Sequence, residues 1–200
     1  MVDESTISYY NINAKEYSVE VNKGDMFNNI LKFLNYINKN RSIIDIGCGS
    51  GRDLKFFKQK GYQAFGIDAS KELCKIASDY SKCPVECVDF ISWKSKQKFD
   101  AFWANASLIH LKKEEIINFF ASKFIYLKKG GIIYFSMKKN IKDGYDNKGR
   151  YFTSFSEDLL ESILNVLPKA TIMERWTNCD NLGRNIKWES IINNIIIIKI

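Results

Sequence analysis

The sequence predicts an α/β fold: an open, mostly parallel sheet with helices on both faces. Two patterns support this prediction. Short apolar runs typical of buried strands alternate with segments whose apolar residues recur at helical spacing. A glycine-rich turn, residues 47–51, joins the first of these runs to the helix that follows it. Strands and helices in strict alternation are the unit from which parallel sheets are built.

Each element is predicted from its own pattern. Apolar residues at helical spacing predict a helix from Phe27 to Ile37, and the next helix ends where Lys60 and Gly61 supply a C-terminal cap. Further helices are expected at residues 71–80 and 114–127. Apolar runs bounded by polar residues or glycine predict strands at residues 41–46, 64–67, 85–88, 99–104 and 131–137.

The two ends of the chain depart from this alternation. A long polar connection, residues 138–154, precedes a helix that Ser156 is placed to cap. Two strands, residues 171–177 and 191–198, then follow with no helix between them, so we expect a terminal hairpin with one antiparallel strand. Residues 1–25 have weak apolar periodicity and are expected to form an arm or cap.

Composition restricts the class of protein. The 200 residues suffice for one domain, residues 1–200, and the contents of 46% hydrophobic and 26% charged residues are typical of globular chains. The longest aliphatic run, Ile195 to Ile198, is far shorter than a membrane span. The acidic N-terminus lacks the features of a secretory signal, so we expect a cytoplasmic protein. Five cysteines and one histidine form no ligand cluster, which favours reduced thiols and no metal site.

The turn that contains Gly47, Gly49 and Gly51 is expected to approach a ligand through its backbone. Glycine lacks the Cβ atom that would hold a ligand away, and the following helix presents free N–H groups. A dinucleotide-binding turn needs a glycine where this sequence has Arg52, so the spacing disfavours NAD. Asp45 lies within the strand just before the turn, where a carboxylate suits a cationic group better than a phosphate.

Two further acids end the next two strands. Asp68 follows Gly47 by 21 residues, close to the offset at which a carboxylate meets ribose hydroxyls in nucleotide-binding α/β folds. Asp89 closes the third strand, with Phe90 beside it, and is placed to accept a hydrogen bond from an adenine amine. The carboxyl ends of these strands line one crevice, so the set predicts a nucleotide-like ligand. The alternative for each acid alone is that it caps the following helix.

With these motifs the chain resembles the class I S-adenosylmethionine-dependent methyltransferases, and the resemblance covers nearly the whole chain. Residues 45–51 look like the family's glycine motif, Asp68 like its ribose acid and residues 89–90 like its adenine motif. Residues 99–111 and 127–131 are similar to its fourth-strand motif and to the turn before its fifth strand. The resemblance is closest to the small-molecule branch that includes the tellurite-resistance and trans-aconitate types.

The resemblance implies a Rossmann-like sheet of seven strands, the last antiparallel, and S-adenosyl-L-methionine as the cofactor. The residues it implies for cofactor binding are Tyr17, Asp45, Gly47, Cys48, Gly49, Gly51, Arg52, Asp68, Ala69, Asp89, Phe90 and Asn105. The implied activity is transfer of a methyl group to an oxygen, nitrogen or sulfur nucleophile of a small-molecule acceptor.

Other functions stay open. One alternative is a methyltransferase that acts on RNA or protein, and another is a non-catalytic S-adenosylmethionine-binding protein. The net charge of +7 suits an anionic partner, but only five of the thirty basic residues are arginine, so nucleic-acid binding is not favoured. Amine methylation of nucleic acids is also disfavoured, because residues 105–108 read Asn-Ala-Ser-Leu where those enzymes carry Asn/Asp-Pro-Pro-aromatic. We expect no membrane partner and either a monomer or a homodimer.

Two residues are candidates for the acceptor side of the site. His110 follows the fourth strand and serves as a general base, as a substrate-orienting group or as a structural residue; an ordinary pKa of about 6.5 suits the first role. Arg150, in the long loop, either clamps an anionic substrate or is a solvated loop arginine. Asp180 and Arg184, between the last two strands, rank below these two.

The N-terminal arm contains Tyr9, Tyr10 and Tyr17. Aromatic faces attract cations, and a sulfonium is a cation. These rings are therefore expected either to close over the cofactor or substrate, or simply to pack the arm against the rest of the chain.

Overall fold

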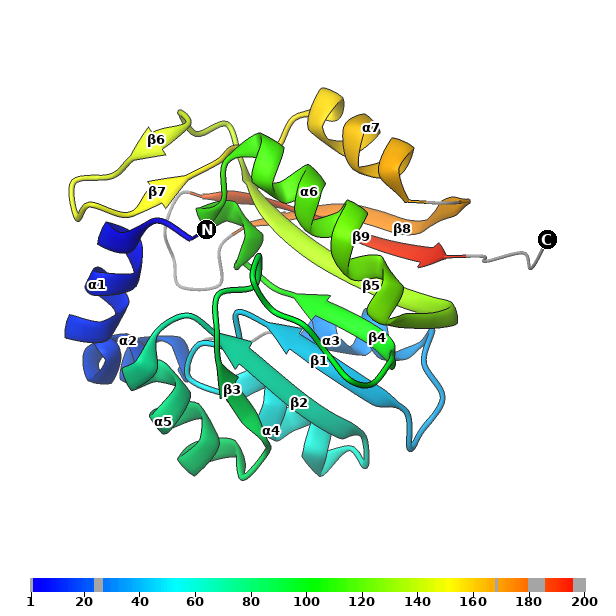
Figure 1. The fold of residues 1–200 in the computed structure, drawn as a ribbon, viewed down its shortest axis with the longest axis horizontal. Helices are drawn as coiled ribbons and strands as arrows, with labels where there is room; N and C mark the ends of the chain where they lie inside the picture. The colour runs from blue at the N-terminus through cyan, green and yellow to red at the C-terminus, as the bar shows by residue number, and fades with distance from the viewer. Residues whose placement is uncertain (1, 24–26, 168, 180–185, 196–200) are drawn as a thin grey trace.

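The computed structural model describes residues 2–23, 27–167, 169–179 and 186–195, and it has the predicted α/β architecture (Figure 1). Seven strands form one sheet in the order β3-β2-β1-β4-β5-β9-β8. These strands are β1 (Ser42–Ile46), β2 (Gln63–Asp68), β3 (Val85–Cys87), β4 (Phe99–Ala104), β5 (Leu127–Lys139), β8 (Ala170–Cys179) and β9 (Lys187–Ile195). The Rossmann-like, mostly parallel sheet expected from the sequence is confirmed.

The strand order places a crevice at the carboxyl end of β1. This strand pairs in parallel with β2 on one side and with β4 on the other, so that Asp45 lies opposite both Gly66 and Trp103. After β1 the chain adds β2 and β3 on one side of that strand, and it then returns to add β4 and β5 on the other side. The connections that leave the carboxyl ends of β1 and β4 therefore turn away from each other. Ligands of open α/β sheets bind at such a switch in strand order.

The terminal hairpin is confirmed, with a detail that the sequence did not indicate. β8 and β9 are antiparallel to each other, and β9 is also antiparallel to β5. The final strand therefore inserts between β5 and β8 rather than adding at the edge of the sheet. The predicted stretch 196–198 lies outside the described residues.

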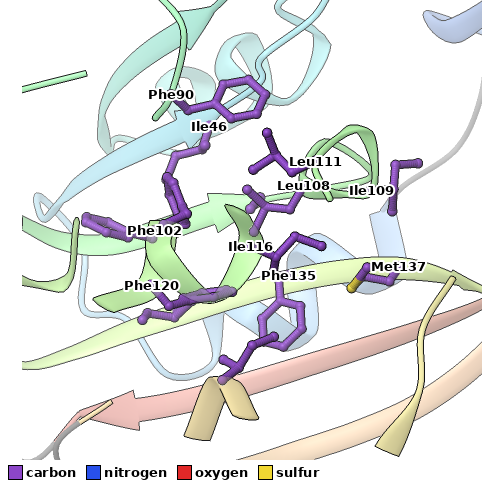
Figure 2. Packing of buried hydrophobic residues seen from close by; sticks show 14 of the residues in the cluster. Ile46, Phe90, Phe102, Leu108, Ile109, Leu111, Ile116, Phe120, Phe135 and Met137 are labelled. Carbon is purple, nitrogen blue, oxygen red and sulfur yellow. The ribbon is translucent and has the colours of Figure 1, made fainter. Parts of the chain in front are cut away.

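Helices cover both faces of the sheet, as predicted. They are α3 (Phe27–Leu34), α4 (Arg52–Gln59), α5 (Lys71–Ser81), α6 (Lys113–Lys123) and α7 (Glu157–Val166). One face packs Phe33 and Phe57 against Trp103, whose ring stacks on Tyr134 at 3.9 Å between centroids. Figure 2 shows the other face, where Phe120 and its neighbours from α6 meet the strands. Full burial of such side chains contributes about 1.5–3 kcal/mol each and holds the strand ends in register.

Several predicted boundaries differ from the structure. The helix expected from Phe27 to Ile37 ends at Leu34, and two further boundaries are wrong for identifiable reasons. The helix expected at residues 114–127 ends at Lys123 and continues as a 3₁₀ turn, Phe124–Tyr126. β5 starts at Leu127, before the two glycines that were expected to precede the strand. Its register against β4 shifts after Phe99, and Gly130, with φ +71°, absorbs the irregularity. A glycine pair therefore forms a bulge within this strand rather than the turn before it.

The polar connection at residues 138–154 contains a small antiparallel ribbon, β6 (Gly144–Tyr145) and β7 (Tyr151–Phe152), that the sequence did not reveal. Asp146 closes its loop by accepting hydrogen bonds from the backbone N–H groups of Lys148 and Arg150, each at 2.9 Å. Strands of two residues carry no alternation that periodicity could detect. Ser156 caps α7 as predicted, accepting from the Leu159 N–H at 3.2 Å.

The N-terminal arm forms two helices, α1 (Glu4–Ile12) and α2 (Ala14–Val21), beside the β6–β7 ribbon (Figure 1). Ser5 Oγ donates to the Gly149 carbonyl at 2.6 Å, and Tyr151 N–H donates to Thr6 Oγ1 at 2.9 Å. The arm therefore docks across the carboxyl ends of the strands. Within the described residues, no helix is long and apolar enough to cross a membrane.

Candidate functional site

The glycine turn lies at the carboxyl end of β1, and its three glycines all have positive φ, from +54° to +78°. The N–H groups of Gly47 and Cys48 both donate to the Ile67 carbonyl, at 2.8 and 3.0 Å, which ties the turn to β2. A Cβ atom on Gly47 would lie 2.4 Å from Cβ of Ser107. The turn therefore accepts only glycine at position 47, and its backbone packs directly against the segment after β4. Cys48 contributes its backbone here, with its side chain buried.

Asp68 joins the turn to the next strand. Its carboxylate accepts from Gly49 N–H at 2.9 Å and from Ser70 N–H at 2.8 Å. Burial raises the pKa of Asp68, and these backbone hydrogen bonds only partly oppose that effect. Asp68 therefore does not cap the following helix, α5, whose N-cap is Ser70; it holds that cap residue, shapes the glycine turn and lines the smaller cavity.

A pair of buried acids lies beneath the turn. Asp45 is 3% exposed, and its pKa is raised well above the ordinary value by burial and by the nearby negative charge of Asp53. Within the described residues, no group donates a hydrogen bond to the Asp45 carboxylate. Asp53, by contrast, accepts from Arg52 Nε at 2.7 Å and from Trp103 Nε1 at 2.9 Å. Arg52 thus serves as the counterion of the acid pair, and Asp45 is the member left for a cationic ligand.

Asn105 is fixed just past the end of β4. Its Oδ1 accepts from Ser136 Oγ at 2.9 Å, and Ser136 Oγ itself accepts from Ala106 N–H at 2.9 Å. Tyr134 also contacts Asn105 Oδ1, at 3.4 Å. With Oδ1 used in this way, the Asn105 amide nitrogen is directed toward Asp53, at 3.4 Å.

Two cavities meet at these residues. The larger is a cleft of about 990 Å³, lined by the glycine turn, α2, the end of β4 and the β6–β7 ribbon. The smaller, of about 50 Å³, lies between the glycine turn and α1 and is lined by Asp68, Ala69, Phe90 and Ser107. Ser107 Oγ is buried and has no hydrogen-bond partner in the described part of the chain. A buried hydroxyl without a partner is costly unless a ligand supplies one.

The arm closes the smaller cavity, and two of its tyrosines lie at the site. Tyr17 lies over the turn: a Cβ on Gly49 would be 3.5 Å from the Tyr17 hydroxyl. Tyr10 meets Tyr17 edge-on at 5.1 Å between ring centroids. Burial raises the pKa of Tyr17 and raises that of Tyr10 to about 12, so both phenols stay protonated. Tyr10 lines both cavities.

Asp89 differs from the sequence-based expectation. Its carboxylate accepts from the backbone N–H groups of Val2 and of Ile91, the latter at 2.7 Å. It lines neither cavity, although its neighbour Phe90 does. The observed partners of Asp89 are therefore the N-terminal segment and its own loop, and a role toward adenine stays a prediction.

His110 lies in the 3₁₀ turn after β4 and faces both cavities. Its Nδ1 is 2.8 Å from the Tyr151 carbonyl, and its Nε2 is 3.0 Å from the Tyr10 hydroxyl. Because a carbonyl only accepts, Nδ1 carries the proton and Nε2 accepts from Tyr10. Burial lowers the pKa of His110 to about 4, and the positive charges of Arg150 and Lys138 add to this effect. The ring is therefore neutral and a weak base at neutral pH.

Arg150 comes from the β6–β7 ribbon and also lines the cleft. Its Nε and Nη2 donate to Asp146 Oδ2, at 3.0 and 2.7 Å. The guanidinium lies over the rings of Tyr9 and Phe152, at 4.7 and 5.1 Å from their centroids. It is held in place rather than solvated freely, and only 19% of its side chain is exposed.

The structure thus brings most of the predicted residues to one place. Those that line the two cavities are Tyr17, Asp45, Gly47, Cys48, Gly49, Arg52, Asp68, Ala69, Phe90, Asn105, His110 and Arg150. Gly51 packs behind the turn instead, where a Cβ would lie 2.8 Å from the Ala77 backbone. Asp180 and Arg184 lie outside the described residues. Asp53 and Ser107 were not predicted, because an acid in a first helical turn and a serine after a strand are common in any fold.

Comparison with known proteins finds methyltransferases. Residues 43–131 match the family described as "Methyltransferase domain". An uncharacterized methyltransferase of Alkaliphilus oremlandii (strain OhILAs) is 37% identical over 75 residues, which are 36% of this chain and 34% of that protein. The matched segment therefore spans about a third of the relative's length.

Two solved structures share the fold. One is the Burkholderia thailandensis 1,6-didemethyltoxoflavin-N1-methyltransferase, with 1,6-didemethyltoxoflavin and S-adenosylhomocysteine bound; its TM-score is 0.75 at 16% identity, over 96% of this chain and 85% of that one. The other is the magnesium protoporphyrin IX methyltransferase of Synechocystis PCC 6803 with S-adenosylmethionine bound. Its TM-score is 0.72 at 15% identity, over 97% of this chain and 98% of that one.

Proposed function

We propose that the protein is a class I S-adenosylmethionine-dependent methyltransferase that transfers a methyl group to an oxygen, nitrogen or sulfur nucleophile of a small molecule. Residues 43–131 match a methyltransferase domain, and a solved methyltransferase shares the fold, which supports the proposal. The observation that carries the proposal is the junction of the two cavities at the glycine turn. There the backbone of Gly47 and Gly49 borders both cavities, the buried acid Asp45 lines the larger one, and the unpartnered hydroxyl of Ser107 lies at the smaller one. The single domain of residues 1–200 and a cytoplasmic location are part of this proposal.

The residues fit that cofactor. The residues that line the narrow cavity, among them Asp68, Ala69 and Phe90, have the chemistry for a nucleoside, because a carboxylate accepts from ribose hydroxyls and an aromatic ring packs against a base. Ser107 Oγ offers the same ligand an unused hydrogen bond. Asp45 and the Gly47–Gly49 backbone border the wider cleft, where Asp45 suits an ammonium group. When bound, S-adenosylmethionine supplies an electrophilic methyl group on a sulfonium.

The protein's own residues would act chiefly by alignment. Displacement at a sulfonium needs an in-line nucleophile held close to the methyl carbon, and positioning of this kind contributes most of what such a reaction requires. Tyr10 and His110 form a neutral hydrogen-bonded pair at the junction of the cavities, which suits orientation of an acceptor. A pKa of about 4 makes His110 a poor general base at neutral pH, so we favour the orienting role over proton removal.

The acceptor side would be formed by the ribbon and the end of β5. The cleft is large enough for a small metabolite beside the cofactor. The arm helices and the β6–β7 ribbon contact each other through Ser5 and Gly149, and both border that space. A partly closed site of this kind favours a small acceptor over an extended polymer.

Methyl-labelled S-adenosylmethionine and a deproteinised cell extract test this function. We expect a labelled small molecule and an equivalent amount of S-adenosylhomocysteine, both detected by mass spectrometry. Formation of S-adenosylhomocysteine only when RNA or protein is added would contradict the small-molecule proposal. Tight cofactor binding without any transfer would make the chain a non-catalytic binding protein.

A further inference from the structure

The charges around the cleft are divided between two walls. The wall built by α2, β1 and the start of α4 carries four carboxylates and one guanidinium: Glu16, Glu20, Asp45, Asp53 and Arg52. The wall built by the end of β5 and the ribbon segment carries four cations and one carboxylate: Lys138, Lys142, Lys148, Arg150 and Asp146. In Figure 1, β6 and β7 lie at the upper left of the view and α4 at the bottom, so the ribbon and α4 are far apart. One wall of the cleft is therefore mainly negative and the other mainly positive.

Aromatic rings hold the cations of the second wall. Lys138 Nζ lies 3.7 Å from the centroid of Phe152, and the Arg150 guanidinium lies over the same ring at 5.1 Å. Arg150 and Lys148 both lie over Tyr9, at 4.7 and 5.8 Å. Such cation–π contacts fix long side chains, so these charges lose less conformational freedom when a ligand arrives.

The positive charge of this wall reaches the reaction space. Besides burial, Arg150 and Lys138 both lower the pKa of His110, whose Nε2 bonds Tyr10 at the junction of the cavities. Arg150 also opposes the effect of burial on the Tyr10 hydroxyl. A group bound near Tyr10 and His110 is therefore exposed to a positive field, which stabilises an anion and repels a cation.

The positive charge of the proposed cofactor complements the negative charge of the acidic wall. Asp45 is the buried acid that no described residue neutralises by a hydrogen bond, and a donor that carries an ammonium and a sulfonium is cationic. The cofactor's carboxylate is bonded to the same carbon as its ammonium, so we expect it beside the acidic wall, where Arg52 supplies a cation. The basic wall is therefore not needed for the cofactor. It is also the wall that faces the space left for the acceptor.

We propose that the methyl acceptor is an anionic small molecule, a carboxylate or a phosphate, whose charged group binds to the Lys138–Arg150 wall. This inference rests on the proposed function, since it names the class of acceptor for the same site. Arg150 is the residue that contributes most, because Asp146 holds its guanidinium in one orientation and a guanidinium binds oxyanions with two parallel hydrogen bonds. Lys142 and Lys148, exposed at the rim, draw the anion toward the cleft.

The experiment separates acceptor activity by charge before its identity is known. A deproteinised extract is passed over anion-exchange and cation-exchange resins at pH 8, and each fraction is assayed with methyl-labelled S-adenosylmethionine and the full chain. Acceptor activity should be retained by the anion-exchange resin. Loss of that activity after phosphatase treatment identifies a phosphate, and its persistence identifies a carboxylate. Activity that is retained by the cation-exchange resin, or that neither resin retains, overturns the inference.

Three variants test whether the Lys138–Arg150 wall is responsible for binding the acceptor. Arg150→Gln should raise KM for the active fraction by roughly tenfold, and Lys142→Gln by about threefold, as expected for losing one charged contact and one rim charge. Lys129→Gln removes the same charge from the exposed opposite end of β5 and should leave KM unchanged. Equal effects of Lys142→Gln and Lys129→Gln would contradict a local role.

The failure of this inference can be told apart from failure of the proposed function. If no fraction accepts a methyl group and S-adenosylhomocysteine does not bind, the function itself is wrong. If transfer occurs but the acceptor is neutral or cationic, the function stands and only the anionic class is wrong.

Discussion

The two ends of the sheet use aspartate in opposite ways. At the amino-terminal ends of the strands, Asp100 accepts from Ser42 N–H at 2.9 Å, from Ser42 Oγ at 2.8 Å and from Lys128 Nζ at 2.7 Å. Burial opposes its ionisation, but these hydrogen bonds outweigh burial and lower the pKa of Asp100 to about 2. At the carboxyl ends, burial raises the pKa values of Asp45 and Asp68 instead.

This difference in pKa indicates that the amino-terminal ends of the strands stabilise the protein and that their carboxyl ends bind a ligand. A carboxylate whose partners all belong to the chain contributes to folding. Asp45 accepts no hydrogen bond from the described residues; a buried carboxylate of this kind costs stability and is retained where a ligand supplies the missing charge. Asp68 has partners in the chain, but its side chain also lines the smaller cavity. Variants matched across the two ends should therefore separate effects on ligand affinity from effects on folding.

The largest difference is expected between two glycines with positive φ. Gly47→Ala at the carboxyl end adds a Cβ 2.4 Å from Ser107 Cβ, whereas Gly61→Ala at the amino-terminal end adds one to open space. Gly47→Ala combines backbone strain with overpacking, about 3 kcal/mol in all, and should reduce S-adenosylhomocysteine affinity roughly 100-fold. Gly61→Ala should cost only about 1 kcal/mol of stability.

Calorimetry measures the affinities of these two variants, and urea unfolding measures their stabilities. Circular dichroism at the working temperature checks that Gly47→Ala remains folded. Comparable affinities for both alanine variants would remove the glycine turn from the binding site.

A smaller difference is expected between Asp68→Ala and Asp100→Ala. Asp68→Ala loses the contacts to Gly49 and Ser70 as well as those to a ribose, so affinity for S-adenosylhomocysteine should fall by about tenfold or more. Asp100→Ala loses only contacts within the chain and should lower the free energy of unfolding by about 1–3 kcal/mol with normal affinity. An Asp68→Ala protein that binds normally would leave Asp68 as a structural residue alone.

The effect that is smallest at neutral pH, because it develops only on acidification, is a pH dependence of stability that involves His110. The unfolded state, with an ordinary pKa of about 6.5, binds a proton more readily than the folded state, with a pKa of about 4. Stability from the neutral ring is therefore complete above about pH 6.5 and is lost as the pH falls toward 4, by about 3 kcal/mol in all. Tyr10, Arg150, Lys138 and Asp146 are the charged or titratable groups that set this environment.

His110→Gln should remove this part of the pH dependence. The measurement is urea unfolding of both proteins at intervals from pH 4 to 7, where the other titrating groups are common to the two. Parallel stability profiles would contradict a buried neutral His110. An acid limb in the rate near pH 6.5 rather than pH 4 would restore the general-base role.

The sequence predicted the fold and the residues of the cofactor side more completely than those of the acceptor side. Strands and glycine turns can be predicted because their evidence is local in the sequence: the alternation of apolar residues and the spacing from Gly47 to Asp68. The β6–β7 ribbon has no such evidence, because its strands have two residues each. The contacts of Tyr10 with His110 and of Val2 with Asp89 join residues about a hundred positions apart. Such pairs arise from the docking of the arm, which no local pattern specifies.

The same limit explains Asp53 and Ser107. Asp53 matches any acid in a first helical turn, and only the strand β4 beside it, with Trp103 Nε1 at 2.9 Å, reveals its buried position. Ser107 stands out only because its hydroxyl is buried without a partner in the described residues. Three-dimensional packing, rather than residue type, identifies both.

The most direct test of the central claim, that the carboxyl ends of β1, β2 and β4 hold S-adenosylmethionine, is a calorimetric titration of the intact chain with S-adenosylhomocysteine and, separately, with NAD. We predict saturable binding of S-adenosylhomocysteine at one site per chain and none of NAD, because Arg52 stands where a pyrophosphate cradle needs a third glycine. Tight binding of NAD with no binding of S-adenosylhomocysteine would contradict the account.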